Sequence, residues 1–348
     1  MNINIVKTCG VALTAFCICS CSVNTQTQKN EYIVPGEVWN DTEGNPVNAH
    51  GGGILYHDGT YYWYGEYKKG KTVLPDWATW ECYRTDVTGV SCYSSTDLLN
   101  WKFEGIVLPA VKDDPEHDLH PSKVLERPKV VYNKKTGKFV MWAHVESADY
   151  SKACAGVAVS DSPAGEFKYL GSFRPNDAMS RDQTVFVDDD GQPYIYTSGA
   201  GKGCWGAKLR KDDWTKLDGV MSPLTGFTDF HEAPWVHKYK GKYYLSHSDN
   251  HASSQGGNRM QYSVSNNPLG PFTPCGVYMY PHGEETAHGS IVEYKGKWYA
   301  FYHTANYSGR GALRSVCVDP IEYDQNDRLK VVQNWGQPYG GKAPEVDL

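Results

Sequence analysis

The 348-residue sequence has a formal net charge of -6 at pH 7, from 34 Lys and Arg against 40 Asp and Glu. With no basic surplus to release counterions, this composition argues against nucleic acid or another anionic partner. The length is enough for one large domain, and 13% of the residues are aromatic. Aromatic faces pack well between twisted sheets and also form platforms for sugar rings.

Residues 1–20 are predicted to be a lipoprotein signal peptide and not part of the fold. Lys7 precedes an apolar run, residues 11–18, that is too short to span a bilayer as a helix. The run ends at Ile18-Cys19-Ser20-Cys21, which matches a bacterial lipobox with Cys21 as the lipidated first residue of the mature chain. An ordinary cleaved signal peptide is the alternative. Both interpretations predict an exported protein, and the first predicts a lipid anchor to a bacterial membrane, facing the periplasm or the cell surface.

The polar residues that follow the lipobox predict a flexible tether over residues 21–31, which would hold the folded domain away from the membrane. Six cysteines remain beyond this tether, with no Cys-x-x-Cys spacing and no paired His, so we expect no zinc site. An oxidising compartment permits disulfides, and Cys82 with Cys92 is the pair close enough in sequence to favour one.

A turn glycine followed by an aromatic strand recurs five times in the rest of the chain. The glycines are Gly59, Gly137, Gly191, Gly241 and Gly296, separated by 78, 54, 50 and 55 residues. Self-similarity with a period near 50 residues is typical of a propeller, in which each unit is a small antiparallel sheet. The sequence therefore predicts an all-β, five-bladed β-propeller that forms a single domain over residues 32–348. The longer first spacing locates two polar insertions, residues 68–81 and 111–123, which we expect to form loops.

Each aromatic hairpin is preceded by a polar residue at nearly the same distance from the turn glycine. These residues are His50, Glu126, Asp182, Glu232 and His288, which lie 9, 11, 9, 9 and 8 residues before their glycines. Equivalent positions on successive blades are related by rotation about the propeller axis, so these side chains should converge on one funnel.

Two carboxylates in different environments are what hydrolysis of a glycosidic bond requires, because one must be protonated to give the leaving oxygen a proton. Glu232 precedes the apolar run Ala233-Pro234-Trp235, which is expected to desolvate it and raise its pKa. Asp182 follows Arg181, whose guanidinium is expected to keep it ionised. The sequence thus predicts Glu232 as an acid and Asp182 as the group that modulates it.

These motifs resemble glycoside hydrolase family 43, whose members are five-bladed propellers that invert configuration. The segment from Ser180 to Gly191 resembles the third-blade motif, whose first Asp, here Asp182, modulates the pKa of the acid and orients it. His231-Glu232-Ala233-Pro234 resembles the fourth-blade motif, whose Glu is the general acid. Ala287-His288-Gly289-Ser290 resembles the fifth-blade motif, whose His faces a cation, usually calcium, at the axis. The resemblance therefore implies one structural calcium near His288 and no organic cofactor.

The first blade departs from the family pattern, because Asn48-Ala49-His50-Gly51 stands where members usually have an Asp as general base. The absence of that Asp and the run Leu125-Glu126-Arg127-Pro128-Lys129 both resemble the exo-β-1,3-galactanase branch. The segment from Gly289 to His303 resembles α-L-arabinofuranosidase and β-xylosidase members equally well, so the sugar and the linkage stay open.

Three residues are candidates to position the attacking water in place of the missing Asp. Glu126 ranks first because it occupies the same repeat position as the other residues predicted to line the funnel. Its alternative role is a hydrogen bond to a sugar hydroxyl. Glu66 ranks second, with a structural ion pair to Arg or Lys as the alternative. His50 ranks third, with packing beside three glycines as the alternative. The residues predicted to bind substrate are His50, Asn48, Glu66, Arg127, Arg181 and Trp235.

The predicted function is that of an inverting exo-glycoside hydrolase that removes terminal galactose or arabinose from a plant arabinogalactan-type polysaccharide, as a monomer. Exo action is favoured because the insertion at residues 68–81 is long enough to wall off the funnel. An arabinofuranosidase or xylosidase acting on arabinan or xylan is one alternative. A surface glycan-binding protein without catalytic activity and a propeller that scaffolds protein partners are the others.

Overall fold

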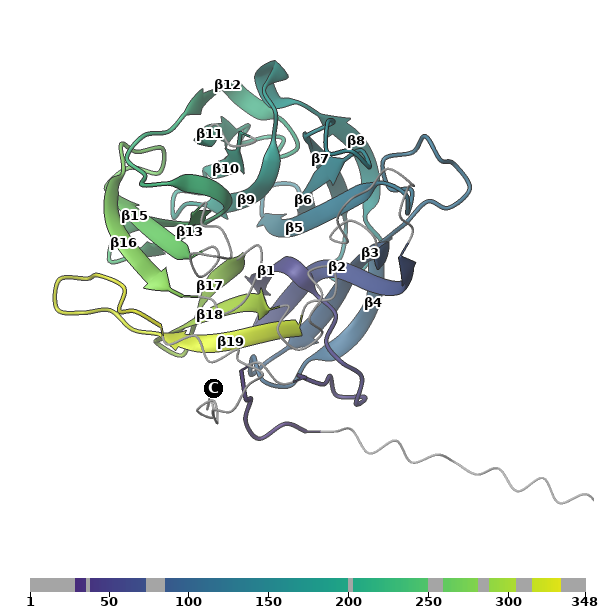
Figure 1. Ribbon diagram of the computed structural model, residues 1–348, viewed down its shortest axis with the longest axis horizontal. Helices are drawn as coiled ribbons and strands as arrows, with labels where there is room; N and C mark the ends of the chain where they lie inside the picture. The colour runs from purple at the N-terminus through teal and green to yellow at the C-terminus, as the bar shows by residue number, and fades with distance from the viewer. Residues whose placement is uncertain are drawn as a thin grey trace, which may run out of the picture.

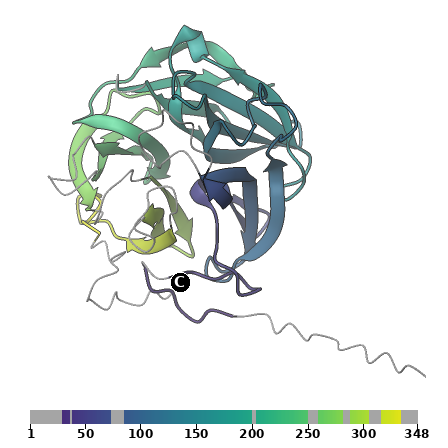
Figure 2. The same ribbon diagram turned by 45° about the vertical axis from the view of Figure 1, so that its right-hand side comes forward.

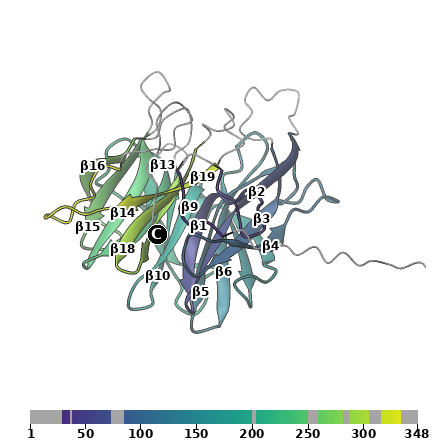
Figure 3. The ribbon, with the colours of Figure 1, turned by 90° about the horizontal axis from the view of Figure 1, so that it is seen from below.

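The computed structural model describes residues 29–35, 38–72, 85–199, 203–249, 259–280, 288–304 and 315–332. Over these residues the chain forms five antiparallel sheets that follow one another around a central axis (Figure 1). The predicted all-β, five-bladed propeller is therefore confirmed. Turning the molecule by 90° shows the strands along their length (Figure 3).

Each blade is a meander in which neighbouring strands in sequence are neighbours in the sheet. Blade one contains β1 (His50–His57), β2 (Thr60–Thr72), β3 (Thr85–Ser95) and β4 (Lys102–Pro109). Blade two contains β5 (Val124–Asn133), β6 (Lys138–Glu146), β7 (Cys154–Ser160) and β8 (Lys168–Phe173). A 3-10 turn, η1 (Pro175–Asp177), leads into blade three, with β9 (Arg181–Val187), β10 (Pro193–Ser198), β11 (Cys204–Leu209) and β12 (Leu217–Pro223).

Blade four contains β13 (Phe230–Tyr239), β14 (Lys242–Asp249), β15 (Met260–Ser265) and β16 (Thr273–Met279). Blade five contains, among the described residues, β17 (Gly289–Tyr294), β18 (Lys297–Thr304) and β19 (Ser315–Ile321). The first strand of each blade contacts the first strands of its neighbours, so β1, β5, β9, β13 and β17 surround the axis.

The five glycines of the sequence repeat occupy the same place in every blade, between its first and second strands. All five adopt a left-handed backbone, with φ between 70° and 79°. In three blades the preceding residue is left-handed as well: Asp58, Lys240 and Lys295 have φ of 48°, 46° and 50°. Two successive residues with positive φ form the two-residue turn whose twist matches that of a β-hairpin, and glycine enters this conformation at little cost. Local turn chemistry thus sets the blade count.

Five clusters of buried apolar residues fill the five gaps between neighbouring blades. Tyr64 and Met141 belong to the cluster between blades one and two, and Trp142 and Ile195 to the cluster between blades two and three. The remaining gaps contain equivalent clusters, built largely from the aromatic strands of the repeat. A sheet covered on both faces must be apolar on both faces, which explains the high aromatic content.

The ring closes where blade five meets blade one. Trp39, which precedes β1, packs with Trp63, Trp101 and Phe301 at centroid distances of 5.5, 6.5 and 6.1 Å. The residues before β1 run along blade one (Figure 2), where the Thr42 N–H donates to the carbonyl of Trp101 at 2.9 Å. Aromatic packing therefore joins the first and last blades.

Several sequence predictions concern segments that the structure describes only in part. The predicted loop at residues 68–81 begins as strand, because β2 continues to Thr72, and residues 73–81 lie outside the described residues. Residues 111–123 form turns, as predicted. Cys92 is a buried free thiol, so the predicted bond to Cys82, which lies outside the described residues, is not formed. The signal peptide and Cys21 also lie outside. Among the described residues, no helix is long and apolar enough to cross a membrane.

Candidate active site

The inner strands of four blades carry a β-bulge at equivalent positions. The pairing register shifts between His50 and Gly53 in β1, Glu126 and Lys129 in β5, Arg181 and Gln183 in β9, and Glu232 and Trp235 in β13. One residue in each bulge is left-handed: Gly51, Arg127, Asp182 and Ala233 have φ of 55°, 54°, 20° and 60°. Bulges redirect side chains, and left-handed residues other than glycine gather at functional sites. In blades one to four, the polar residues that share a position in the sequence repeat therefore lie in or next to a β-bulge.

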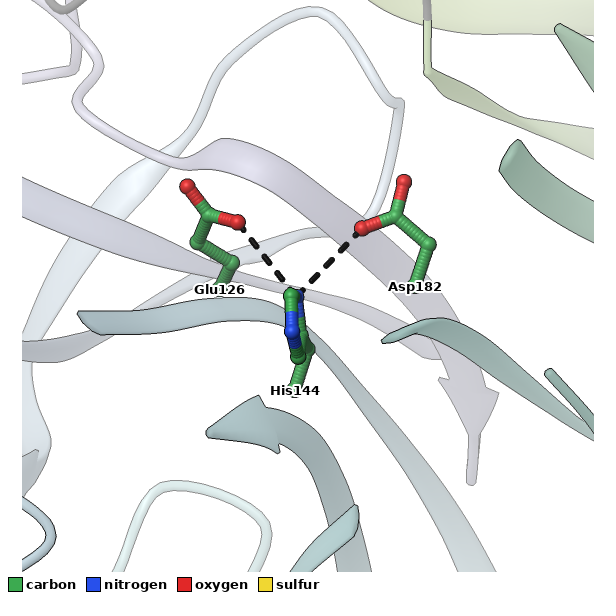
Figure 4. Close-up of side chains that lie close together, drawn as sticks. All are labelled: Glu126, His144 and Asp182. Carbon is green, nitrogen blue, oxygen red and sulfur yellow. Dashed lines mark ion pairs between the residues drawn. The ribbon is translucent and has the colours of Figure 1, made fainter. Parts of the chain in front are cut away.

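The predicted carboxylates of blades two and three meet at a histidine that the sequence analysis missed. Glu126 from β5 and Asp182 from β9 both face His144 from β6 (Figure 4). The Nδ1 atom of His144 lies 3.4 Å from Glu126 Oε2 and 3.6 Å from Asp182 Oδ1, and its Nε2 lies 3.3 Å from Glu146 Oε1. One buried imidazole thus bridges three carboxylates.

The charges of this cluster support one another. Burial opposes protonation of His144, but the neighbouring carboxylates of Asp182, Glu126 and Glu146 outweigh burial and raise its pKa well above the usual value. Burial also opposes ionisation of Glu126, but His144 and Arg127 lower its pKa to about 2. The pKa of Asp182 is well below its usual value, because Arg127 and His144 outweigh its burial. The cluster is therefore an imidazolium between carboxylates at neutral pH.

The arginine that keeps Asp182 ionised is Arg127, and the prediction that Arg181 does so is wrong. Arg127 Nε lies 3.2 Å from Asp182 Oδ1, and both side chains are buried. Arg181 instead pairs with Glu146 at 3.0 Å and lies over the ring of Tyr150. Successive residues of a strand point to opposite faces, so adjacency in sequence did not mean contact.

The blade-one position that lacks a carboxylate is filled by Arg127. A Cβ atom on Gly51 would lie 2.7 Å from Arg127 Nη1 and 2.7 Å from Glu66 Oε1, so a side chain there would collide with both. Gly51 also has a left-handed φ, which favours glycine. A side chain on residue 51 and the observed position of Arg127 therefore exclude each other.

Glu232 lies on the bulge of β13, and its side chain is 20% exposed, more than those of Asp182 and Glu126. Its Oε2 atom is 3.7 Å from His231 Nε2. The backbone N–H of the next residue, Ala233, donates to Asp182 Oδ2 at 3.2 Å. Asp182 therefore holds the backbone next to Glu232, whose carboxyl group stays partly exposed.

Two residues predicted to bind substrate are engaged in structural contacts. The Asn48 side chain is bound to the backbone of Lys68, donating to its carbonyl at 2.8 Å and accepting from its N–H at 3.1 Å. Glu66 Oε2 pairs with Lys68 Nζ at 3.0 Å, and Oε1 accepts from the backbone N–H of Arg127 at 3.0 Å. The ion pair weighed as the alternative for Glu66 is thus present. His50 lies opposite Glu66 in the ladder and is buried.

The position of Trp235 does not support its predicted contact with substrate. Its indole N–H donates to the carbonyl of Ile291 at 3.2 Å, which ties blade four to blade five. Its ring lines a cavity of about 620 Å³ together with residues from the later halves of β1, β5 and β9. This cavity lies toward the opposite ends of the inner strands from Glu232 and Asp182.

His288, predicted as a calcium ligand, is surrounded by groups that do not fit that ion. Its Nε2 atom lies 2.9 Å from Lys129 Nζ, and its Nδ1 atom lies 3.8 Å from Asp182 Oδ2. Calcium takes six to eight oxygen ligands, whereas an amine occupies the position beside Nε2. The atoms of Glu126, His144 and Asp182 lie within 4.8 Å of one another, but His144 offers a nitrogen where calcium prefers oxygen ligands.

Among the groups missed by the sequence analysis, His144 and Lys129 left a trace in the sequence. His144 pairs with Glu126 across the β5 to β6 hairpin. Counting paired residues outward from the turn, with one bulge allowed, would therefore have found it. Lys129 stands two residues after Arg127 within the quoted motif. The hydroxyl of Tyr150, which donates to Glu126 Oε1 at 3.0 Å, comes from a loop and had no such signal.

We expect the stability of the protein to fall as the pH is lowered from about 4.5 toward 2, since this is the range between the ordinary and folded pKa of Glu126. A depressed carboxyl pKa contributes stability above the unfolded value and loses it as pH falls through the folded value. His144 remains charged in this range. Urea unfolding at pH 6 and pH 3 measures the difference, which should be smaller in Glu126→Gln; an equal difference in the variant would contradict the assignment.

Comparison with known proteins agrees with this geometry. Residues 44–329 match the model of "Glycosyl hydrolases family 43". A β-xylosidase of Xylanibacter ruminicola is 36% identical over 226 residues, which cover 51% of this chain and 66% of that protein. A xylosidase/arabinosidase of Bacteroides ovatus is 33% identical over 244 residues, covering 57% of this chain and 71% of that protein. These alignments span about half of the chain and about two thirds of the relatives.

Solved structures match over more of the chain. A family 43 β-1,3-galactosidase with galactodeoxynojirimycin superposes with a TM-score of 0.72 at 31% identity, covering 86% of this chain and 98% of that one. An exo-β-1,3-galactanase from Phanerochaete chrysosporium with galactose has a TM-score of 0.72 at 27% identity, covering 86% of this chain and 66% of that one. Because the family model spans residues from all five blades, the chain belongs to family 43 of the glycosyl hydrolases.

Proposed function

We propose that the protein is an inverting exo-glycosidase that removes a terminal galactose or arabinose from an arabinogalactan-type polysaccharide of plants, with β-1,3-linked galactose as the first candidate. The observation that carries this choice is the first-blade position, where the inner strand has Gly51 instead of an acidic residue and Arg127 packs over it. The likeness over 86% of the chain to a β-1,3-galactosidase structure supports it.

Glu232 is the proposed general acid. Its carboxyl group is the more exposed of the two funnel carboxylates on blades three and four, so it can reach a glycosidic oxygen above the bulge. Asp182 stays ionised beside Arg127 and binds the N–H of Ala233, so it orients Glu232 through the backbone. Proton donation to the leaving oxygen by Glu232 would allow the glycosidic bond to break as the ring oxygen stabilises the positive charge.

Glu126 is proposed to hold the attacking water, or a sugar hydroxyl, as a fixed anionic acceptor. Tyr150 Oη and His144 hold its two oxygens from opposite sides. With a pKa of about 2, Glu126 is a weak base toward water itself. The oxygen that has bonded to the anomeric carbon is a strongly acidic oxonium, so Glu126 is basic enough to take its proton late in the step.

The test is incubation with β-1,3-galactan, arabinogalactan, arabinan and xylan, followed by identification of the released sugar. We expect galactose as the only product from β-1,3-galactan, released first as the α-anomer and detected by proton NMR within minutes. Release of xylose alone would refute the proposed sugars, and release of arabinose alone would refute β-1,3-linked galactose as the first candidate. A ladder of oligosaccharides would refute exo action, and an initial β-anomer would refute inversion.

A second candidate, an α-L-arabinofuranosidase or β-xylosidase acting on arabinan or xylan, is favoured by the Xylanibacter and Bacteroides relatives. The same incubation separates it from the first. Binding of a polysaccharide without release of any sugar would instead indicate a glycan-binding protein. A monomeric state, export and a lipid anchor on Cys21 remain predictions from the sequence.

A further inference from the structure

A buried lysine lies among the inner strands at the floor of the candidate site. Lys129 belongs to β5, and its ammonium donates to the carbonyl of Gly51 at 2.8 Å and to His288 Nε2 at 2.9 Å. The carbonyl of Arg127 lies 3.5 Å away. An ammonium has three donors and no acceptor, and three acceptors surround this one. Because Gly51 belongs to blade one and His288 leads into blade five, the lysine joins three blades.

The backbone around Lys129 leaves room for its aliphatic stem. A Cβ atom on Gly53 would lie 2.5 Å from Lys129 Cδ, so the glycine of blade one accommodates the lysine of blade two. Farther along the inner strands, the same stem lines the cavity of about 620 Å³ that Trp235 also lines. Lys129 therefore lies between the candidate site and that cavity, with its charged end toward the site.

The contacts of Lys129 lead to the proposed acid through two residues. His288 Nδ1 lies 3.8 Å from Asp182 Oδ2, and the same Asp182 oxygen accepts from the N–H of Ala233 beside Glu232. His288 Nε2 lies 2.9 Å from Lys129 Nζ, and because an ammonium has only donors, Nε2 is the acceptor of this pair. Burial and Arg127 lower the pKa of Lys129 to about 7, against the opposite effects of Asp182 and Glu66.

We propose that Lys129 takes the place of the axial cation in this protein, so that its own amine positions His288 and Asp182 and no divalent ion is needed. A single side chain from β5 thereby supplies hydrogen-bond donors to three acceptors and, in its protonated form, the positive charge that a metal would bring from solution. Lys129 is a positioning residue, since its Nζ contacts His288 and two carbonyls, and the reacting atoms lie above Asp182 and Glu232. This inference does not depend on which sugar is cleaved.

The first test uses the unmodified protein. After treatment with EDTA and desalting, we expect kcat to be unchanged on whichever polysaccharide the incubation identifies, and added calcium to change neither kcat nor Tm. Loss of activity in EDTA that calcium restores, or a calcium-dependent rise in Tm, would overturn the proposal. The Tm measurement decides the matter even if no substrate is cleaved, so failure of the proposed function is distinguishable from failure of this inference.

The second test is Lys129→Met, which keeps the length of the stem and removes the charge. We expect kcat to fall by about 10- to 100-fold, the loss typical when a partner that orients a functional group is removed, with KM changed less than about threefold. Lys129→Arg, which keeps the charge, should retain more activity than Lys129→Met. The exposed Lys135→Met is the matched control and should keep the parent kcat. A Lys129→Met variant with the parent kcat would refute the positioning role, and if that variant does not fold, the calcium measurements on the parent decide.

Discussion

Glu232→Gln is expected to lower kcat by about 10²- to 10⁴-fold on a natural disaccharide, the usual contribution of a general acid. Glutamine keeps the shape of the side chain but cannot give a proton to the leaving oxygen. A glycoside of the same sugar with a dinitrophenolate leaving group needs no such proton, so its turnover should fall far less. Measuring kcat/KM on the two substrates separates loss of proton donation from loss of binding.

The control for this experiment is Glu166→Gln, a change to an exposed glutamate on the turn before β8. It removes a carboxylate without touching the funnel and should leave both substrates unaffected. Thermal melting should give the same Tm for Glu232→Gln as for the parent, because the Glu232 side chain is partly exposed and its removal leaves no buried charge. Near-normal turnover of the natural disaccharide by Glu232→Gln would rule out Glu232 as the acid.

Arg127→Met is expected to lower the free energy of unfolding by about 3–5 kcal/mol, because removing one partner of a buried ion pair leaves the other charge in the interior without its nearest cation. That charge is Asp182, which is 4% exposed and lies 3.2 Å from the guanidinium. Methionine replaces most of the side-chain volume and faces the same left-handed backbone cost as arginine at φ 54°, so the change isolates the charge. Urea unfolding at neutral pH measures the difference.

The matched control is Arg210→Met, which removes an exposed partner of Asp212. Exposed ion pairs contribute little to stability because water and salt screen them, so this variant should unfold almost as the parent does. If Arg127→Met and Arg210→Met unfolded at the same urea concentration, the Arg127–Asp182 pair would not be the buried support that the structure indicates.

Arg127 and Lys129 occupy the space beside the first-blade strand that lacks an Asp. Arg127 reaches Asp182 across the space that a side chain on residue 51 would need, and Lys129 projects from the same strand two residues later. Both cations belong to β5, as does Glu126. Blade two therefore contributes the acceptor proposed for water and the positive charges that keep the neighbouring carboxylate ionised.

The fold could be predicted from sequence because its determinants are local. A turn glycine and the aromatic strand after it define one hairpin without help from the rest of the chain, and the five glycines count the blades. The shared repeat position of Glu126, Asp182 and Glu232 could be predicted for the same reason, since each lies at a nearly constant distance from its own turn glycine.

The residues that contact Glu126, Asp182 and Glu232 could not be predicted from the sequence. They lie on other strands, and their positions depend on bulges that shift the pairing register. Arg181 was assigned to Asp182 by adjacency, but the pleat directs it to Glu146. His144 and Lys129 carried no functional signal when taken alone in the sequence.

The sequence by itself determined the blade count, the phase of the funnel residues and the family, because turn chemistry and motif spacing are properties of short segments. Only the tertiary structure decided which cation accompanies which carboxylate. The reason is physical: Arg127, His144 and Lys129 act across gaps between blades, over distances of about 3 Å that bulges and glycine contacts set, and electrostatic effects in a buried site change steeply over such distances.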